Sequence, residues 1–167
     1  FHVFTHAFFK ALLFMGAGAV IIALRHEQNI FKMGGLKREL KLVYVTMFVA
    51  TLAISGIPPF AGFFSKDAIL VAAFASEHYV IWSVATLTAG LTAFYMFRLL
   101  FSVFHAEPKE SKELHHLPKS MTYPLVFLAL GSATAGFFGL NEAYGGSSWI
   151  NAFLNLPDMS VRLSHST

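Results

Sequence analysis

The sequence predicts an all-α membrane protein, a polytopic bundle of about four transmembrane helices with the second broken at Pro58-Pro59. Composition is the first reason, because 56% of the 167 residues are hydrophobic and only 13% are charged. An average soluble domain carries roughly 25% charged residues. The second reason is the presence of long apolar stretches, each reaching the roughly 20 residues that a helix needs to cross the hydrocarbon core.

The expected membrane spans cover about 3–24, 42–74 (discontinuous), 79–104 and 121–140, within a single membrane-embedded fragment, residues 1–167. A further apolar segment at 149–156 is too short to cross, so we expect it to lie at the interface. The chain opens with Phe1 inside an apolar pattern and shows no secretory signal. We therefore expect an internal or C-terminal piece of a longer protein.

Basic residues gather in two of the loops, which predicts the orientation. The expected loops at 25–41 and 105–119 carry most of them, namely Arg25, Lys32, Lys37, Arg38, Lys41, Lys109, Lys112 and Lys119. The turn around Glu77 has no Lys or Arg. Since basic loops stay on the cytoplasmic side of a membrane, we expect the two basic loops to be cytoplasmic and the Glu77 turn to face outward.

The second span contains the sequence SGIPPFAGFFSKD, from Ser55 to Asp67. Its two prolines remove backbone donors and disfavour helix at the preceding residues. This predicts two half-helices joined by an unwound stretch. In lipid, irregular backbone persists only where protein or water satisfies it, so we expect the break to face the protein interior or a hydrated cavity. Broken helices are typical of ion sites in transporters.

The first span carries three protonatable side chains at intervals of four residues, His2, His6 and Lys10. At about 100° per residue they drift by about 80° in total, so we expect them to share one helix face. Charged groups inside a membrane are costly and usually face the bundle interior, and histidine changes charge near neutral pH. They are therefore candidates for a proton relay. The alternatives are an interfacial His2, a packing role for His6 and a Lys10 that reaches the headgroups.

Lys66 and Asp67 follow the break and complete the set of candidate relay residues. Adjacent residues on a helix point in different directions, so a direct bond between them does not follow from the sequence. The alternatives are a structural ion pair, or a helix cap made by Ser65 and Asp67. Arg98, in the third span, is expected to reach the cytoplasmic headgroups rather than to act in the relay.

Several other functions are disfavoured. The chain has no Cys, which removes thiolate metal ligands, and it has no Gly-rich phosphate loop. Its basic residues lie in loops between apolar spans, so nucleic-acid binding is not expected. His115 and His116 lie near Glu110 and Glu113 without the spacing of a compact metal site, and a solvated loop is the better interpretation. We therefore expect no metal and no cofactor in this chain.

Three motifs resemble the antiporter-like, proton-translocating subunits of respiratory complex I (NADH:quinone oxidoreductase), called L in bacteria and chain 5 in mitochondria. They are HAFFKALLFMGAGAVI at 6–21, HEQNIFKMGGL at 26–36 and GIPPFAGFFSKDAIL at 56–70. Their order and separation fit the family, and LTAFYMFRLLF at 91–101 adds weaker support. The region after Lys119 is not distinctive.

The resemblance implies proton translocation driven by quinone reduction in other subunits of the complex. It implies that Lys10, His6 and His2 are the central Lys and its nearby histidines, and that Lys66, beside Asp67, lies at the outlet end of the path. It also implies an inner membrane, bacterial or mitochondrial, with other membrane-arm subunits, the lipid bilayer, protons and ordered water as partners. The family's N-terminal half and its long lateral helix lie outside this sequence.

The hypothesis for the mechanism is that a proton on the His2, His6 and Lys10 face passes through ordered water to Lys66, which exchanges with the outer side. One alternative is a subunit of a multisubunit Na⁺/H⁺ antiporter or a membrane-bound hydrogenase, which are relatives of the family with similar local chemistry. A second is a structural scaffold, which predicts that Lys10 and Lys66 are each paired with an acidic or carbonyl group.

Overall fold

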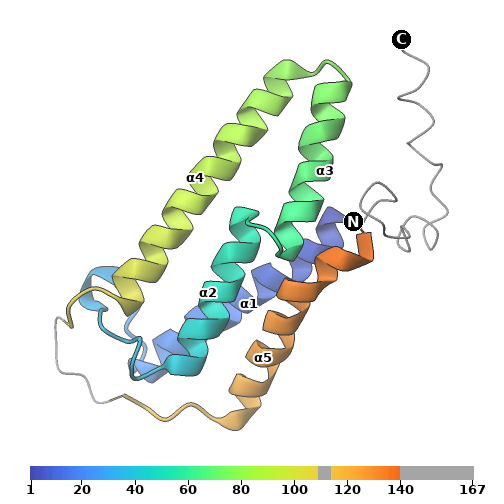
Figure 1. The fold of residues 1–167 in the computed structure, drawn as a ribbon. Helices are drawn as coiled ribbons and strands as arrows, with labels where there is room; N and C mark the ends of the chain where they lie inside the picture. The colour runs from blue at the N-terminus through green and yellow to red at the C-terminus, as the bar shows by residue number, and fades with distance from the viewer. Residues whose placement is uncertain (109–113, 140–167) are drawn as a thin grey trace.

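A computed structural model describes residues 1–108 and 114–139, and this part of the chain is all-helical (Figure 1). The elements in chain order are α1 (His2–Ala23), η1 (Ile30–Lys32), α2 (Lys41–Ser55), α3 (Ala61–Ala75), α4 (Tyr79–Phe104), α5 (Lys119–Thr134) and η2 (Ala135–Gly139). The predicted fold class is confirmed. The expected interfacial segment at 149–156 and the last residue of the expected fourth span lie outside the described residues.

Three helical segments of the described chain are long and apolar enough to cross a membrane, namely His2–Ala23, Tyr79–Phe104 and Lys119–Gly139. The first has 22 residues and is therefore about 33 Å long, close to the roughly 30 Å of a hydrocarbon core. The second expected span is indeed two helices, α2 and α3, of 15 residues each. Neither reaches the roughly 20 residues that a crossing helix needs, and that the pair forms one span stays a prediction.

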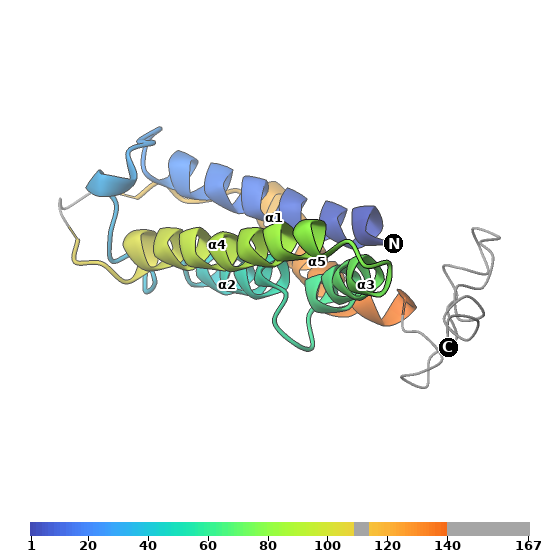
Figure 2. The same ribbon diagram turned by 90° about the horizontal axis from the view of Figure 1, so that it is seen from above.

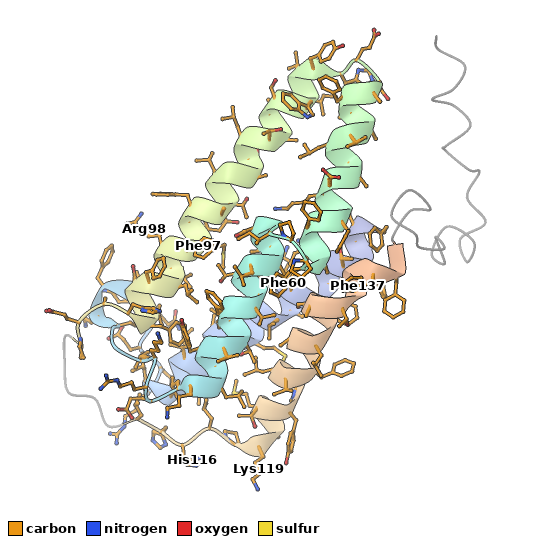
Figure 3. The ribbon with its side chains drawn as sticks, viewed as in Figure 1. Phe60, Phe97, Arg98, His116, Lys119 and Phe137 are labelled. Atoms are coloured by element: carbon orange, nitrogen blue, oxygen red, sulfur yellow. The ribbon has the colours of Figure 1, made fainter. Side chains whose placement is uncertain are left out.

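The two loops predicted to be cytoplasmic meet at one end of the bundle (Figure 1). The backbone N–H of Lys37 donates to the carbonyl of Phe104 at 3.2 Å, and that of His115 donates to the carbonyl of Ala23 at 2.9 Å. Lys119 also lies at this end, as Figure 3 shows. The basic residues that the structure describes in these loops are therefore gathered on one side, whereas the assignment of that side to the cytoplasm stays a prediction.

The core lies between α1, α2, α5 and the second half of α4. Its fully buried side chains include Leu12, Leu100, Phe104 and Leu125. Seen from above, α1 lies along one edge of the bundle and α2 and α3 lie toward the opposite edge (Figure 2). The first half of α4 rises with α3 as a hairpin beyond the rest of the bundle (Figure 1), and its apolar side chains there are exposed. Arg98 points away from the bundle (Figure 3).

Candidate functional site

The break between α2 and α3 begins with a glycine turn. Gly56 has φ 75°, in the left-handed region that glycine adopts without steric cost. Its N–H donates to the carbonyl of Ala53 and the N–H of Ile57 donates to the carbonyl of Leu52, both at 3.1 Å. This pair of bonds is a Schellman motif, which uses two of the free carbonyls at a helix end. The chain then passes through the two prolines to Phe60, the N-cap of α3 (Figure 3).

Lys66 bonds a third carbonyl at this end of α2. Its Nζ donates a hydrogen bond to the carbonyl of Ile54, in the last turn of α2. The carbonyl end of a helix carries a partial negative charge, so a lysine is favoured there. The side chain is partly buried. The structure therefore places Lys66 at the carboxyl end of α2, and its partner Ile54 is twelve residues away in sequence.

The close contact between the two half-helices depends on Gly62. A Cβ at this position would collide with the carbonyl oxygen of Ala53, and it would lie 3.6 Å from Phe9 Cε1 on α1. Because glycine has no Cβ, the first turn of α3 can lie directly against the last turn of α2. Phe9 is fully buried at the same point, so α1, α2 and α3 all meet at the break.

A buried polar contact joins α1 to α3 one residue before Lys66. Ser65 Oγ lies 3.0 Å from His2 Nδ1, and Thr5 Oγ1 lies 2.9 Å from Ser65 Oγ. The Thr5 hydroxyl is also 3.0 Å from the His2 carbonyl, and the Ser65 hydroxyl is 3.4 Å from the Gly62 carbonyl. Thr5 is 0% and Ser65 1% exposed. These hydroxyls are excluded from solvent and depend on one another for hydrogen bonds.

The other two members of the predicted α1 face lie progressively farther from the contact with α3. The His2 and His6 rings are 5.6 Å apart, and His6 packs edge-on against Phe9 at 5.2 Å. Lys10, one further turn along, is exposed. Within the described residues it has no hydrogen bond or ion pair. Within the described residues the face that these three share therefore runs from the contact with α3 at His2 to exposed surface at Lys10, because the drift of about 80° carries Lys10 away from the buried side of α1.

Asp67 is half-buried and has no hydrogen-bond or ion-pair partner among residues 1–108 and 114–139. It does not pair with Lys66. The capping alternative for Ser65 and Asp67 is wrong, because α3 begins at Ala61, its N-cap is Phe60 and no side chain caps it. Both residues lie in the second turn, and Ser65 is used in the contact with α1.

Sequence reasoning missed Thr5 and Ser55 as parts of this site, and it considered Ser65 only as a helix cap. Ser55, the last residue of α2, has a buried hydroxyl with no hydrogen-bond partner in the described part of the chain. The available signal was that each is a small polar residue in an apolar helix, next to the break or one turn from a histidine. That signal identifies a buried hydroxyl but not its partner.

A bundle of apolar spanning helices that includes a broken helix defines the chain as a multi-pass membrane protein. Residues 1–92 match the transmembrane family described as NADH:quinone oxidoreductase/Mrp antiporter. The match covers more than half of the chain, and the chain belongs to this family.

Curated relatives and a solved structure agree with this membership. The NADH-quinone oxidoreductase subunit L of Rhodobacter capsulatus is 40% identical over 94% of this chain and 24% of its own length. That of Pseudomonas aeruginosa is 52% identical over 70% of this chain and 19% of its own length. The chain thus spans about a quarter or less of the relatives that it matches. A structure of the Mrp complex from Dietzia sp. DQ12-45-1b has a TM-score of 0.71 at 20% identity, covering 81% of this chain and 33% of that one, and it shares the fold.

Proposed function

We propose that this chain is part of an antiporter-like subunit of NADH:quinone oxidoreductase and that it carries protons across an inner membrane, bacterial or mitochondrial. The support comes from relatives of that name at 40% and 52% identity. Quinone reduction and the redox cofactors belong to other subunits of the assembly in this proposal. Neighbouring membrane-arm subunits, lipid, protons and ordered water are the partners of this chain.

The observation that carries the proposal is the position of Lys66 on the Ile54 carbonyl at the break. A lysine that gains and loses a proton needs a partner in both states. A charged ammonium and a neutral amine both keep N–H groups that can donate to a carbonyl, so Ile54 can hold the side chain through a proton exchange. Ser55, the residue after Ile54, has a buried hydroxyl without a hydrogen-bond partner among the described residues, and this hydroxyl can bond an ordered water.

The proposed route begins on α1 and ends at Lys66. A proton enters on the side of Lys10, moves past His6 to His2, and reaches Lys66 through ordered water. His2 is the member of the α1 set that touches α3, through Ser65. Lys66 then exchanges its proton with the outer side of the membrane, and Asp67 in the next position of α3 lowers the electrostatic cost of the charged state.

Lys10 requires a cover that the described residues do not provide. It is exposed on α1 among apolar side chains such as Val3 and Phe14, which are 82% and 71% exposed. A lysine facing lipid near the centre of a membrane costs at least about 2.5 kcal/mol. We infer that the longer protein covers this face of α1 with protein and water.

Two alternatives make different predictions. A Na⁺/H⁺ antiporter subunit is favoured by the fold of the Mrp complex structure, and it predicts that translocation depends on Na⁺. A pure scaffold predicts a fixed partner for both lysines. Lys66 has such a partner and Lys10 has none among the described residues, so a scaffold explains only one of the two.

The test is to replace Lys66 and, separately, Lys10 with Ala in the intact assembly reconstituted into proteoliposomes. Protons translocated per NADH oxidised are measured with and without Na⁺. We expect both variants to translocate fewer protons, while Lys119→Ala, at the basic end of the bundle, matches the wild type. Wild-type stoichiometry in both variants would refute the proposal, and a requirement for Na⁺ would favour the antiporter alternative.

A further inference from the structure

The contact between His2, Thr5 and Ser65 contains more acceptors than hydrogens. Each hydroxyl has one hydrogen and can accept two hydrogen bonds. The Thr5 hydrogen is within reach of both Ser65 Oγ and the His2 carbonyl. The Ser65 hydrogen is within reach of both His2 Nδ1 and the Gly62 carbonyl. Two arrangements of the same atoms therefore satisfy the site, and the protonation state of His2 decides between them.

In the first arrangement His2 is neutral and carries its hydrogen on Nε2. Its Nδ1 accepts the hydrogen of Ser65, and Ser65 accepts the hydrogen of Thr5. In the second arrangement His2 has gained a proton on Nδ1 and is an imidazolium. That N–H donates to Ser65, which turns its own hydrogen to the Gly62 carbonyl, and Thr5 turns to the His2 carbonyl. No hydrogen leaves either hydroxyl, and the one added proton stays on His2.

We propose that Ser65, together with Thr5, is a positioning pair that transmits the protonation of His2 to the start of α3. This inference rests on the proposed proton-translocating function, and it adds two residues and a direction to that route. In the second arrangement the Ser65 hydroxyl donates to the carbonyl of Gly62, in the first turn of α3. Gly62 is the residue that packs against Ala53 of α2. The adjacent residue is Lys66, held on Ile54. The pair thus links a proton on α1 to the helix start that holds the next carrier.

The charged and titratable groups facing His2 are few. Among the described residues they are His6 on its own helix and Lys66 on α3. In the described part of the chain, the elements packed against His2 therefore present to it groups that are cationic or can become so. A proton on His2 repels one on Lys66, and Ser65 is the polar side chain that lies between the two helices at this point.

Two serines and two threonines provide matched tests. Ser132 is 0% exposed and donates to the Leu128 carbonyl of its own helix at 2.8 Å. Thr51 is 0% exposed and donates to the Met47 carbonyl of its own helix at 2.8 Å. Ser132→Ala and Thr51→Val therefore remove buried hydroxyls of the same kind without touching His2. They are the controls for Ser65→Ala and Thr5→Val, and Thr5→Ser keeps the hydroxyl.

The measurement is the pH profile of proton translocation per NADH oxidised, in proteoliposomes that contain the intact assembly, normalised to the amount of assembled complex. We expect Ser65→Ala to shift the profile by about half a pH unit or more, since the hydrogen bond of Ser65 to the charged imidazolium is stronger than its bond to the neutral ring. Thr5→Val should shift it less, and Thr5→Ser should restore the wild-type profile. The two control variants should superimpose on the wild type.

The His2→Phe background separates the possible failures. Ser65→Ala should cause no further shift there, because its effect acts through His2. A Ser65→Ala profile that superimposes on the wild type while His2→Phe is impaired overturns this inference alone. A shift of equal size in the His2→Phe background overturns it as well. A His2→Phe variant with wild-type translocation overturns the proposed route through His2, and the inference with it. If Ser65→Ala fails to assemble, Thr5→Val and Thr5→Ser decide in the same way.

Discussion

Lys66 and Lys10 both interrupt apolar helices, but the described chain surrounds them differently. Lys66 lies at the break, where three helices meet and the Ile54 carbonyl accepts its hydrogen bond. Lys10 lies on the open side of α1, exposed beside Phe14. The difference indicates that a membrane lysine can be held by its own chain or by what surrounds that chain. Lys66 has a local structural role in addition to its proposed function, whereas Lys10 has none within this part of the protein.

The largest expected effect is the difference in stability between adding one methyl group at the packed break and adding one on α1. Gly62→Ala puts a Cβ into the Ala53 carbonyl, and backbone cannot move aside easily, so we expect a destabilisation of about 3 kcal/mol. Gly18→Ala on α1 meets only Met121 Cε at 3.8 Å, and it should be neutral or stabilising by up to about 1 kcal/mol. The thermal midpoint of the assembled complex measures both. Equal tolerance of the two changes would contradict the tight contact at the break.

The next largest effect is the difference in stability between replacing Lys66 and replacing Lys10. Lys66→Met leaves the Ile54 carbonyl without its donor, and we expect it to cost about 1–2 kcal/mol of stability. Lys10→Met removes a charge that makes no hydrogen bond within the described residues, so it should leave the thermal midpoint unchanged or raise it. Both variants are compared by thermal unfolding of the purified assembly. A larger loss for Lys10→Met would mean that the longer protein pairs that lysine firmly.

The smallest effect concerns Asp67. Because its carboxylate has no partner in the described chain, Asp67→Asn should change stability by less than about 0.5 kcal/mol. Its effect on translocation should be smaller than that of Lys66→Met, since the carboxylate acts only through the field at Lys66. Translocation assays on the two variants check this order. A greater loss in Asp67→Asn would make the carboxylate itself a carrier.

The break could be predicted from the sequence because its causes are local. Pro58 and Pro59 remove donors and Gly56 permits a left-handed turn, and none of this depends on distant residues. The structure ends α2 at Ser55 and begins α3 at Ala61 accordingly. The placement of the basic residues in the loops at 25–41 and 105–119 could also be predicted locally. It requires only the positions where the apolar spans begin and end.

The partners in the site could not be predicted because they depend on how the helices fold back. Ser65 and His2 are 63 residues apart, and no periodicity within one helix indicates that they meet. The exposure of Lys10 was within reach of the sequence. Thr5, Phe9, Leu12 and Gly16 mark the buried side of α1, and helical geometry places Lys10 about 130° from its centre. Locating the buried side of α1 first shows that, of the three residues spaced by four, Lys10 lies farthest from it.

The most direct test of the account is the proton stoichiometry of the Lys10→Met/Lys66→Met double variant beside the two single variants. Carriers that act in series share one path, so their effects are not additive. We expect the double variant to translocate as many protons per NADH as the more impaired single variant. Losses that multiply, or a double variant that translocates at the wild-type level, would contradict a single route from α1 to the break.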